Sequence, residues 1–167
     1  MKTQRLNLRR YKKEDMQFVM SIWNDAEMGK YLPDPVFEQI DEVYRRALET
    51  LSEDKSCWYF VAELKETGER IGTCSIMPKE GAVYDIAYCV HKKYWRNAYA
   101  SEMVQGVMEY ARQNGVQKIT VSVAKGNTAS KAVMKKFGFQ VVGEGTFKKR
   151  GTNMVVENEQ YEYQVIY

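Results

Sequence analysis

The sequence predicts a single α/β domain built on a mixed sheet that is mostly antiparallel and contains one parallel crossover. Residues 57–90 form three β-type runs separated by tight turns, which predicts an antiparallel meander. Residues 83–124 then read as strand, helix and strand, and a crossover through a helix places two strands side by side and parallel. The length of 167 residues allows one domain and is too short for two of ordinary size.

The composition is that of an ordinary globular protein. Apolar residues make up 44% and charged residues 28%, and no apolar run approaches the ~18 residues that cross a bilayer. The N-terminal residues lack the apolar core of a signal peptide. Cys57, Cys74 and Cys89 lie in apolar runs and are odd in number, which is typical of reduced thiols. We therefore expect a cytoplasmic protein with no membrane and no metal, and the net charge of +3 does not require nucleic acid.

The first third of the chain predicts one strand and two helices. Alternation over Arg5–Arg9 indicates a short strand, and helical spacing from Lys12–Glu14 indicates a helix that ends near Gly29. Pro33 and Pro35 form a rigid connection, because proline fixes φ and lacks an N–H. The apolar face of the second helix consists of Ile40, Val43, Tyr44, Ala47, Leu48 and Leu51.

The remaining elements are predicted from the same two patterns, alternation for strands and helical spacing for helices. Residues 57–64 and 70–77 form a hairpin, and the strand of residues 83–90 follows. A helix spans 98–113, and a strand follows over 118–124. Asn127 caps a last helix that ends at Gly138. Two closing strands are expected, over residues 139–147 and from Val155 or Glu159 to Tyr167, joined by a basic connection at 148–153.

A basic strand-to-helix junction at His91–Ala111 is the strongest local signal for a ligand. The first turn of a helix leaves backbone N–H groups without partners and carries the positive end of the helix dipole. Lys92, Lys93 and Arg96 add positive charge, and the small side chains of Ala98 and Ala100 leave the backbone accessible. This pattern indicates a phosphate-bearing cofactor at residues 96–101. Many basic turns of this kind bind nothing, so that alternative stays open.

The element order, together with the segments YDIAYCVHKKYWRNAYASE and VAKGNTASKAVMKKFGFQVVGE, resembles the GNAT superfamily of acetyl-CoA-dependent N-acyltransferases over nearly the whole chain. The branch that acetylates the N-terminal alanine of ribosomal proteins is the most similar, because Tyr94-Trp95, Asn127 to Ser130 and Gly138-Phe139 match its motifs. The resemblance implies a GNAT fold with a splayed central strand pair. It also implies transfer of acetyl from acetyl-CoA to a primary amine by direct attack in a ternary complex.

The resemblance also assigns the cofactor contacts. Residues 95–100 fall on the family's phosphate loop, with Ala98 where glycine is usual. The expected cofactor contacts are the amides of Arg96, Asn97, Ala98, Tyr99, Ala100 and Ser101 for the pyrophosphate, Cys89, Val90, His91, Asn127 and Ser130 along the pantetheine arm, and Lys131 or Lys135 at the ribose phosphate.

Amide formation requires a group that accepts the proton of the amine and a donor for the leaving thiolate. By resemblance, Asp85 is the candidate base, although an edge-strand charge facing solvent is the alternative. Many family members carry a tyrosine at the position of Met134, so Ser130 is the candidate acid, with helix capping as its alternative. Strand amides at Cys89 and Val90 are candidates to polarise the thioester carbonyl. The single histidine, His91, is expected to be structural.

The acceptor is expected to bind between residues 23–37 and 148–153, with Trp23, Tyr31 and Tyr84 as candidate contacts. Aromatic residues at this density also serve as packing, which is the alternative for all three. The sequence shows no obvious acidic cluster that would bind a polyamine. The expected partners are an amine-bearing small molecule or a protein N-terminus, with a homodimer as one possible assembly.

Two other functions stay open. A non-catalytic acyl-CoA-binding module or sensor on the same fold is favoured by Ala98 and Met134, which depart from the family pattern. A nucleotide-binding α/β domain would need a longer parallel sheet than the hairpins permit.

Overall fold

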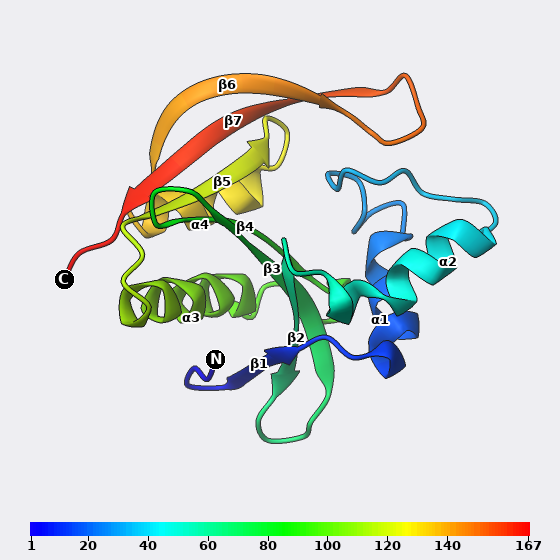
Figure 1. Cartoon of the computed structure of the whole chain (residues 1–167), viewed down its shortest axis with the longest axis horizontal. Coiled ribbons are helices and arrows are strands. Elements are labelled where there is room, and N and C mark those ends of the chain that lie inside the picture. Colours follow the sequence, from blue (N-terminus) through cyan, green and yellow to red (C-terminus); the bar gives the residue numbers. More distant parts are fainter.

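The computed structural model describes residues 1–167 and contains one seven-stranded sheet of order β1-β2-β3-β4-β5-β7-β6 (Figure 1). Only β4 and β5 run parallel, and every other neighbouring pair is antiparallel. The expected mixed sheet with one parallel crossover is therefore confirmed. The strands are β1 (Leu6–Arg10), β2 (Trp58–Leu64), β3 (Arg70–Lys79), β4 (Val83–Val90), β5 (Lys118–Ala124), β6 (Gln140–Lys148) and β7 (Val155–Gln164).

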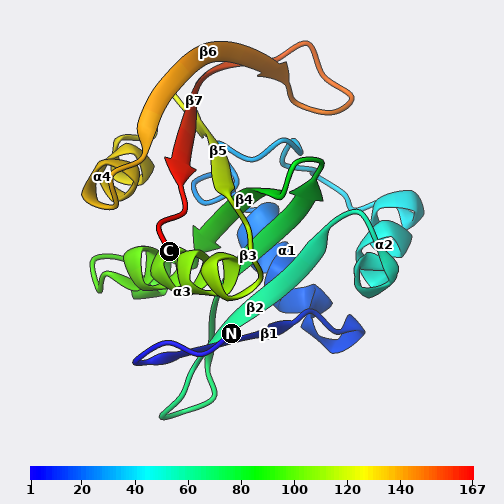
Figure 2. The ribbon, with the colours of Figure 1, turned by 60° about the vertical axis from the view of Figure 1, so that its left-hand side comes forward.

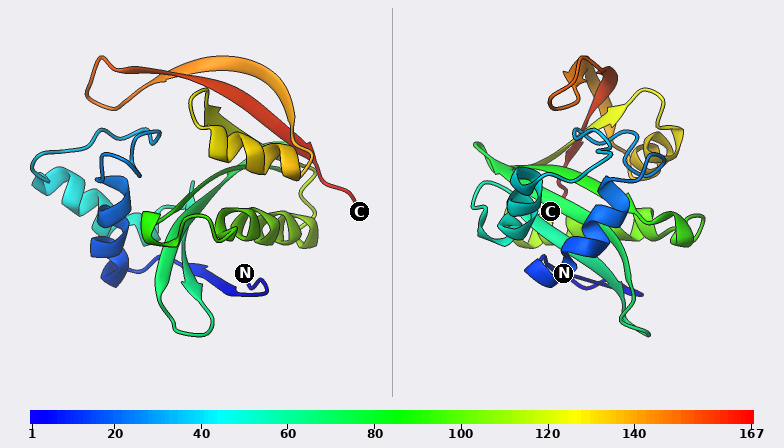
Figure 3. Two further views of the ribbon diagram at one scale, coloured as in Figure 1. Left: turned by 180° about the vertical axis from the view of Figure 1, so that it is seen from behind. Right: turned by 90° about the vertical axis from the view of Figure 1, so that its right-hand side faces the viewer.

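Four α-helices cover the two faces of the sheet. They are α1 (Met16–Trp23), α2 (Glu42–Glu49), α3 (Tyr99–Gln113) and α4 (Thr128–Lys136). The largest core cluster joins α3 and α4 to one face, through side chains such as Met103 and Met134. Side chains of α1 and α2 pack with Val61 on the opposite face of β2. Figure 3 shows α3 and α1 on opposite sides of the central strands. None of the helices is both long and apolar enough to cross a lipid bilayer.

The first helix ends at Trp23, six residues earlier than the expected end near Gly29. Asp25 Oδ1 accepts hydrogen bonds from the backbone N–H groups of Glu27 and Met28, both at 2.9 Å, and such bonds compete with helical pairing. The side chain of Asn24 also pairs with both backbone groups of Phe37, at 2.6 and 3.1 Å. Residues 24–37 therefore form a closed loop rather than a helical extension.

The second helix begins at Glu42, because Asp41 caps it by accepting the N–H of Tyr44 at 2.7 Å. Its predicted apolar face is only partly correct. Leu48 is buried, whereas Val43 is 79% exposed. Val43 therefore does not belong to the core.

The parallel pair β4–β5 is short. Three residue pairs form, from Val83 opposite Lys118 to Asp85 opposite Thr120. Beyond them β4 continues along β3 and β5 continues along β7, so that the two strands diverge. Figure 2 shows β5, β6 and β7 turned away from β2, β3 and β4. The divergence produces the splayed central pair expected for the fold and leaves strand edges facing each other without pairing.

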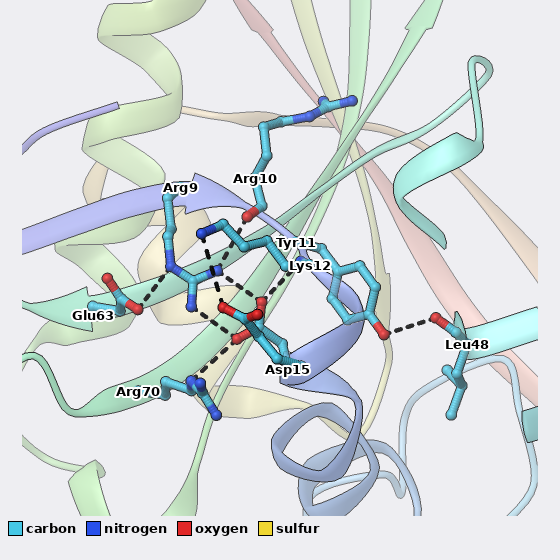
Figure 4. A network of polar contacts seen from close by, with 9 residues as sticks. Arg9, Arg10, Tyr11, Lys12, Asp15, Leu48, Glu63 and Arg70 are labelled. Atoms are coloured by element: carbon cyan, nitrogen blue, oxygen red, sulfur yellow. Dashed lines mark hydrogen bonds and ion pairs between the residues drawn. The ribbon is translucent and has the colours of Figure 1, made fainter. Parts of the chain in front are cut away.

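A buried carboxylate fixes the start of α1 against the sheet (Figure 4). Asp15 is completely buried and accepts two hydrogen bonds from the Arg9 guanidinium, at 2.7 and 2.8 Å. The N–H of Lys12 donates to it at 2.9 Å, and Arg70 Nε lies 3.1 Å away. Burial acts to raise the pKa of Asp15, but these hydrogen bonds and charges outweigh it and hold the pKa below its usual value. The cluster therefore depends on an ionised Asp15.

We expect Asp15→Asn to lower the free energy of unfolding by about 3 kcal/mol at pH 7, because it removes the buried charge that pairs with the partly buried Arg9 guanidinium. The folded-state pKa of Asp15 is lowered, so its contribution is present above the unfolded value of about 4 and is lost as the pH falls below it. Urea unfolding at pH 7 and at lower pH should show the difference between variant and parent shrinking with acidity. Glu14→Gln is the control, because Glu14 is exposed; an equal effect there would contradict the prediction.

Candidate active site

A cavity of about 410 Å³ opens where β4 and β5 diverge. Nineteen of its 28 lining residues are hydrophobic, with tryptophan, tyrosine and cysteine counted among them. The lining residues come from α1, α2, the strands β2 to β5, the end of β6, the start of α4 and adjoining loops such as residues 31–34. The polar and titratable members are Trp23, Tyr31, Asp34, Tyr44, Cys57, Tyr59, Thr73, Cys74, Ser75, Asp85, Tyr88, Cys89, Ser122, Asn127, Ser130 and Arg150.

The loop between β4 and α3 presents unpartnered backbone donors. None of the backbone N–H groups of residues 96–101 donates to an acceptor within the protein, and the first that does is Glu102, to the carbonyl of Ala98 at 3.1 Å. Arg96 and Ala98 both have φ of 61°, in the left-handed region, which directs successive N–H groups to one side as in an anion-binding nest. The predicted phosphate loop therefore has the backbone geometry that a diphosphate requires.

Side chains hold this loop in shape. Asn97 Nδ2 donates to the carbonyls of Tyr94 and Trp95, at 3.1 and 2.9 Å, so its side chain supports the turn. The indole Nε1 of Trp95 donates to the carbonyl of Val90 at 2.7 Å and fixes the corner where β4 ends. Arg96 is exposed and has no ion-pair or hydrogen-bond partner. Lys92 and Lys93, in contrast, are paired with acidic side chains. Arg96 is thus the uncompensated cation at the loop.

Glu102 anchors the first turn of α3, and the sequence analysis did not single it out. Its carboxylate accepts from the Thr3 hydroxyl and the Arg5 N–H at 2.6 Å and from Arg5 Nε at 2.7 Å. Burial acts to raise the pKa of Glu102, but these bonds outweigh it and lower the pKa. Arg5 also donates to the carbonyl of Asn97 at 3.0 Å. The segment that precedes β1 therefore braces the loop from behind. Glu102 could have been found from the sequence, because an acidic residue in the first turn of an expected helix interacts favourably with the helix dipole.

Asp85 lies at the last residue pair shared by β4 and β5 and lines the cavity. Its Oδ1 accepts from the Thr120 hydroxyl at 2.7 Å and its Oδ2 from Lys79 Nζ at 3.0 Å. The carboxylate is therefore fixed in orientation, and each oxygen keeps a further lone pair. Asp85 can accept a proton only through those remaining positions.

Tyr84, a predicted substrate contact, lies elsewhere. It is 8% exposed and packs in the core against Trp58 and Tyr110, with ring centroids 5.8 and 6.3 Å apart. Tyr84 therefore points to the face of β4 that α3 covers, away from the cavity. Tyr84 is absent from the cavity lining and is a packing residue.

Tyr88 and Ser130 meet across the divergence. Their hydroxyl oxygens are 2.7 Å apart, and both residues line the cavity. Burial raises the pKa of Tyr88 to about 12, with the Ser130 hydrogen bond opposing the shift. The N–H of Ser130 donates to Asn127 Oδ1 at 3.1 Å, which confirms Asn127 as the N-cap of α4. Ser130 was predicted from the sequence, whereas Tyr88 was not.

Strand pairing separates the two amides expected to polarise a carbonyl. The N–H of His91 donates to the carbonyl of Ile71 in the β3 ladder. Because backbone groups alternate along a strand, the N–H of Cys89 also faces β3, and that of Val90 faces the divergence. Of the two amides, only that of Val90 therefore lies on the edge of β4 that has no strand partner at this point. Cys89 contributes a partly buried thiol to the cavity, and desolvation raises the pKa of this thiol to about 12.

The other predicted basic contacts have defined positions. His91 caps the short 3-10 turn Lys92–Tyr94 by accepting the N–H of Lys93 on Nδ1 at 3.2 Å, a structural role. Lys131 Nζ lies 2.8 Å from Glu159 Oε1 and is already paired. Lys135 has no ion pair.

The two segments expected to flank the acceptor meet beside the cavity. Lys149 is buried, and its Nζ donates to the carbonyls of Gly29 and Asp34 at 3.1 and 3.3 Å. Burial lowers the pKa of Lys149, with Asp34 opposing the shift. The backbone N–H of Arg150 donates to the carbonyl of Pro33 at 2.9 Å. The connection between β6 and β7 thus holds the loop of residues 24–37 in place.

Trp23 and Tyr31, the other two predicted acceptor contacts, line the cavity from this side. Trp23 Nε1 donates to the Thr73 hydroxyl at 3.2 Å, and the Tyr31 hydroxyl donates to the carbonyl of Gly126 at 2.9 Å. Both polar atoms are therefore satisfied within the protein, and the rings supply apolar surface.

Comparison with known proteins identifies the family of the chain. Residues 5–140 match a family model described as "Acetyltransferase (GNAT) domain". The "Uncharacterized N-acetyltransferase p20" of Bacillus licheniformis is 29% identical over 146 residues, with 84% of this chain and 82% of that protein covered. A solved GNAT-family acetyltransferase from Bacillus anthracis is 26% identical, with a TM-score of 0.81 and 98% and 97% of the chains covered.

A spermidine N-acetyltransferase from Vibrio cholerae, solved in complex with CoA and spermine, also has a TM-score of 0.81, with 96% of each chain covered. At 16% identity that likeness shows the fold alone.

We expect Lys149→Met to lower the free energy of unfolding by about 2 kcal/mol, because two charge-assisted hydrogen bonds are lost from a buried position. Backbone amide hydrogen exchange should become faster in residues 29–34, because the carbonyls of Gly29 and Asp34 lose the Lys149 ammonium that holds the segment in place. Lys148→Met at the neighbouring exposed position is the matched control and should change neither quantity. Equal protection of residues 29–34 in both variants would refute this role of Lys149.

Proposed function

The chain belongs to the GNAT acetyltransferase family, and on that premise we propose that it transfers the acetyl group of acetyl-CoA to a primary amine by direct attack in a ternary complex. The single observation that carries the proposal is the run of unpartnered N–H groups at residues 96–101, at the end of the strand that lines the cavity. A diphosphate held there has an extended arm that can follow the unpaired edge of β4 into the cavity, as an added strand would.

In this proposal each residue has one task. The amides of residues 96–101 and the Arg96 guanidinium bind the diphosphate, and the Val90 N–H polarises the thioester carbonyl. The amine nitrogen attacks the carbonyl carbon, and the electron pair of the C–S bond moves to sulfur. Asp85 accepts the proton of the amine through a water at its remaining lone pairs, and Ser130 donates a hydrogen bond to the sulfur.

The acceptor that we propose is a small primary amine or a protein N-terminus. The cavity is mostly apolar, and its two carboxylates are both paired, Asp34 with Arg150 at 3.2 Å and Asp85 with Lys79 at 3.0 Å. An acceptor with several ammonium groups would find no uncompensated acidic cluster, so polyamines fit poorly. The N-terminal alanine of a ribosomal protein is the specific acceptor that the motifs at Tyr94-Trp95 and Asn127–Ser130 predict, and this assignment stays a prediction.

The second candidate function is acyl-CoA binding without turnover. Ala98 favours it by placing a methyl group at the phosphate loop, but its left-handed φ of 61° already matches the conformation of a glycine. Met134 is fully buried in the core and does not line the cavity, so its lack of a hydroxyl does not bear on proton transfer. Acetyl-CoA binding without thiol release on any amine would support this alternative.

A screen of amines and short peptides with mass detection tests the acetyltransferase proposal. An acetylated product and stoichiometric thiol release are expected for at least one acceptor. Absence of CoA binding by calorimetry would refute both candidate functions.

We expect Arg96→Glu to weaken CoA binding at least about tenfold, because a charge-assisted contact to phosphate is replaced by repulsion. Asp85→Asn should leave CoA affinity within about twofold and lower kcat by about 10² or more. Calorimetry with CoA and a thiol-release assay measure the two effects. Arg112→Glu, at the opposite end of α3, controls for net charge and should bind CoA normally. Equal losses of CoA affinity in the Arg96 and Asp85 variants would refute the division of roles.

A further inference from the structure

The Tyr88–Ser130 pair can donate a hydrogen bond to a ligand in the cavity, and no role has yet been given to Tyr88. The hydroxyl oxygens lie 2.7 Å apart and link β4 to α4 at the cavity, and neither hydroxyl has another hydrogen-bond partner in the protein. Each hydroxyl carries one hydrogen, so a single bond between them uses one hydrogen and leaves the other available. Which hydrogen remains decides what the pair presents to a ligand.

The phenol is the stronger donor of the two, because its conjugate base is delocalised over the ring. When the Tyr88 O–H donates to Ser130 Oγ, the hydrogen of Ser130 is the one left free. The N–H of Ser130 is held by Asn127 at 3.1 Å, so the backbone that carries this hydroxyl is fixed. The free hydrogen then belongs to a short side chain on a fixed helix turn that faces the cavity.

We propose that Tyr88 is a positioning residue that donates its hydrogen bond to Ser130 and thereby directs the Ser130 hydroxyl hydrogen at the leaving sulfur. The proposal rests on the acetyltransferase function given above. As the C–S bond breaks, its electron pair stays on sulfur, and the two O–H groups form a chain of hydrogen bonds that ends there. Both hydroxyls keep their protons. The proton of the amine passes through water to Asp85, and the thiolate takes a proton from solvent after it leaves the site.

The alternative is that Tyr88 supplies a proton through Ser130, and the magnitudes oppose it. The pKa of Tyr88 is about 12, and that of an ordinary thiol is about 8.5. Transfer from the phenol to the thiolate is therefore unfavourable by a factor on the order of 10³. A neutral donor that keeps its proton at every working pH stabilises the thiolate as oxyanion-hole donors stabilise an oxygen anion.

The test is the pKa of the thiol of bound CoA, followed by ultraviolet absorbance of the thiolate in a pH titration. Ser130→Ala should raise this pKa by about one unit, because it removes the donor to sulfur. Tyr88→Phe should raise it by a similar amount, and CoA affinity at low pH, where the thiol is neutral, should stay unchanged. Ser130→Thr keeps a hydroxyl and should retain the parental value. Tyr163→Phe is the matched control outside the cavity.

Turnover provides the second measurement. Tyr88→Phe should lower kcat about tenfold with the KM for the amine unchanged, and the double variant with Ser130→Ala should be no slower than Ser130→Ala alone. An unchanged thiol pKa in Tyr88→Phe, or additive losses in the double variant, would overturn the inference while leaving the acetyltransferase function intact. A parent protein that binds CoA and releases no thiol would instead overturn the proposed function, and with it the assignment of Tyr88.

Discussion

β4 and β5 share only three residue pairs, and the features of the cavity depend on that short pairing. Each strand is fully paired on its other side, β4 with β3 and β5 with β7, so both remain rigid after they separate. Backbone groups on the facing edges therefore lack strand partners without loss of the fold. A full-length parallel pair would fill the gap, and the carbonyl of Val90 would then not be available to Trp95. The separation thus creates the cavity and the corner that shapes the phosphate loop.

Buried or partly buried charges hold the surrounding segments against this framework. Asp15 fixes the start of α1, Glu102 fixes the start of α3, and Lys149 fixes the loop of residues 24–37. Each of these charged side chains hydrogen-bonds to backbone groups, so it fixes the position of the segment that carries them. Such clusters are costly to desolvate and therefore tolerate few alternative arrangements. Catalytic geometry needs that restriction, because small displacements of contacts to the reacting groups reduce the rate strongly.

Periodicity along the chain sufficed to predict most elements, because it is a local property. The phosphate loop stays a prediction, although its local sequence pattern was visible in the same way. The parallel crossover, β5 and the cap at Asn127 were predicted with little error. The end of α1 was wrong, because the Asn24–Phe37 pairing acts over 13 residues and is not visible as a pattern. Tyr88–Ser130, Glu102–Arg5 and Lys149–Gly29 join residues 42, 97 and 120 positions apart. Only tertiary structure brings these groups together, and the catalytic and acceptor assignments stay predictions for the same reason.

The bonds from Lys149 and Arg150 to residues 29–34 have a consequence for biosynthesis. These bonds join the first quarter of the chain to the last. In the same way, β5 gains β7 as its second neighbouring strand only when β7 has left the ribosome. A nascent chain that ends before β7 exposes the edge of β5, which is prone to pair with other chains. Completion of the cavity therefore requires the C-terminal hairpin, and a chain truncated within that hairpin should be prone to aggregation through the exposed edge of β5.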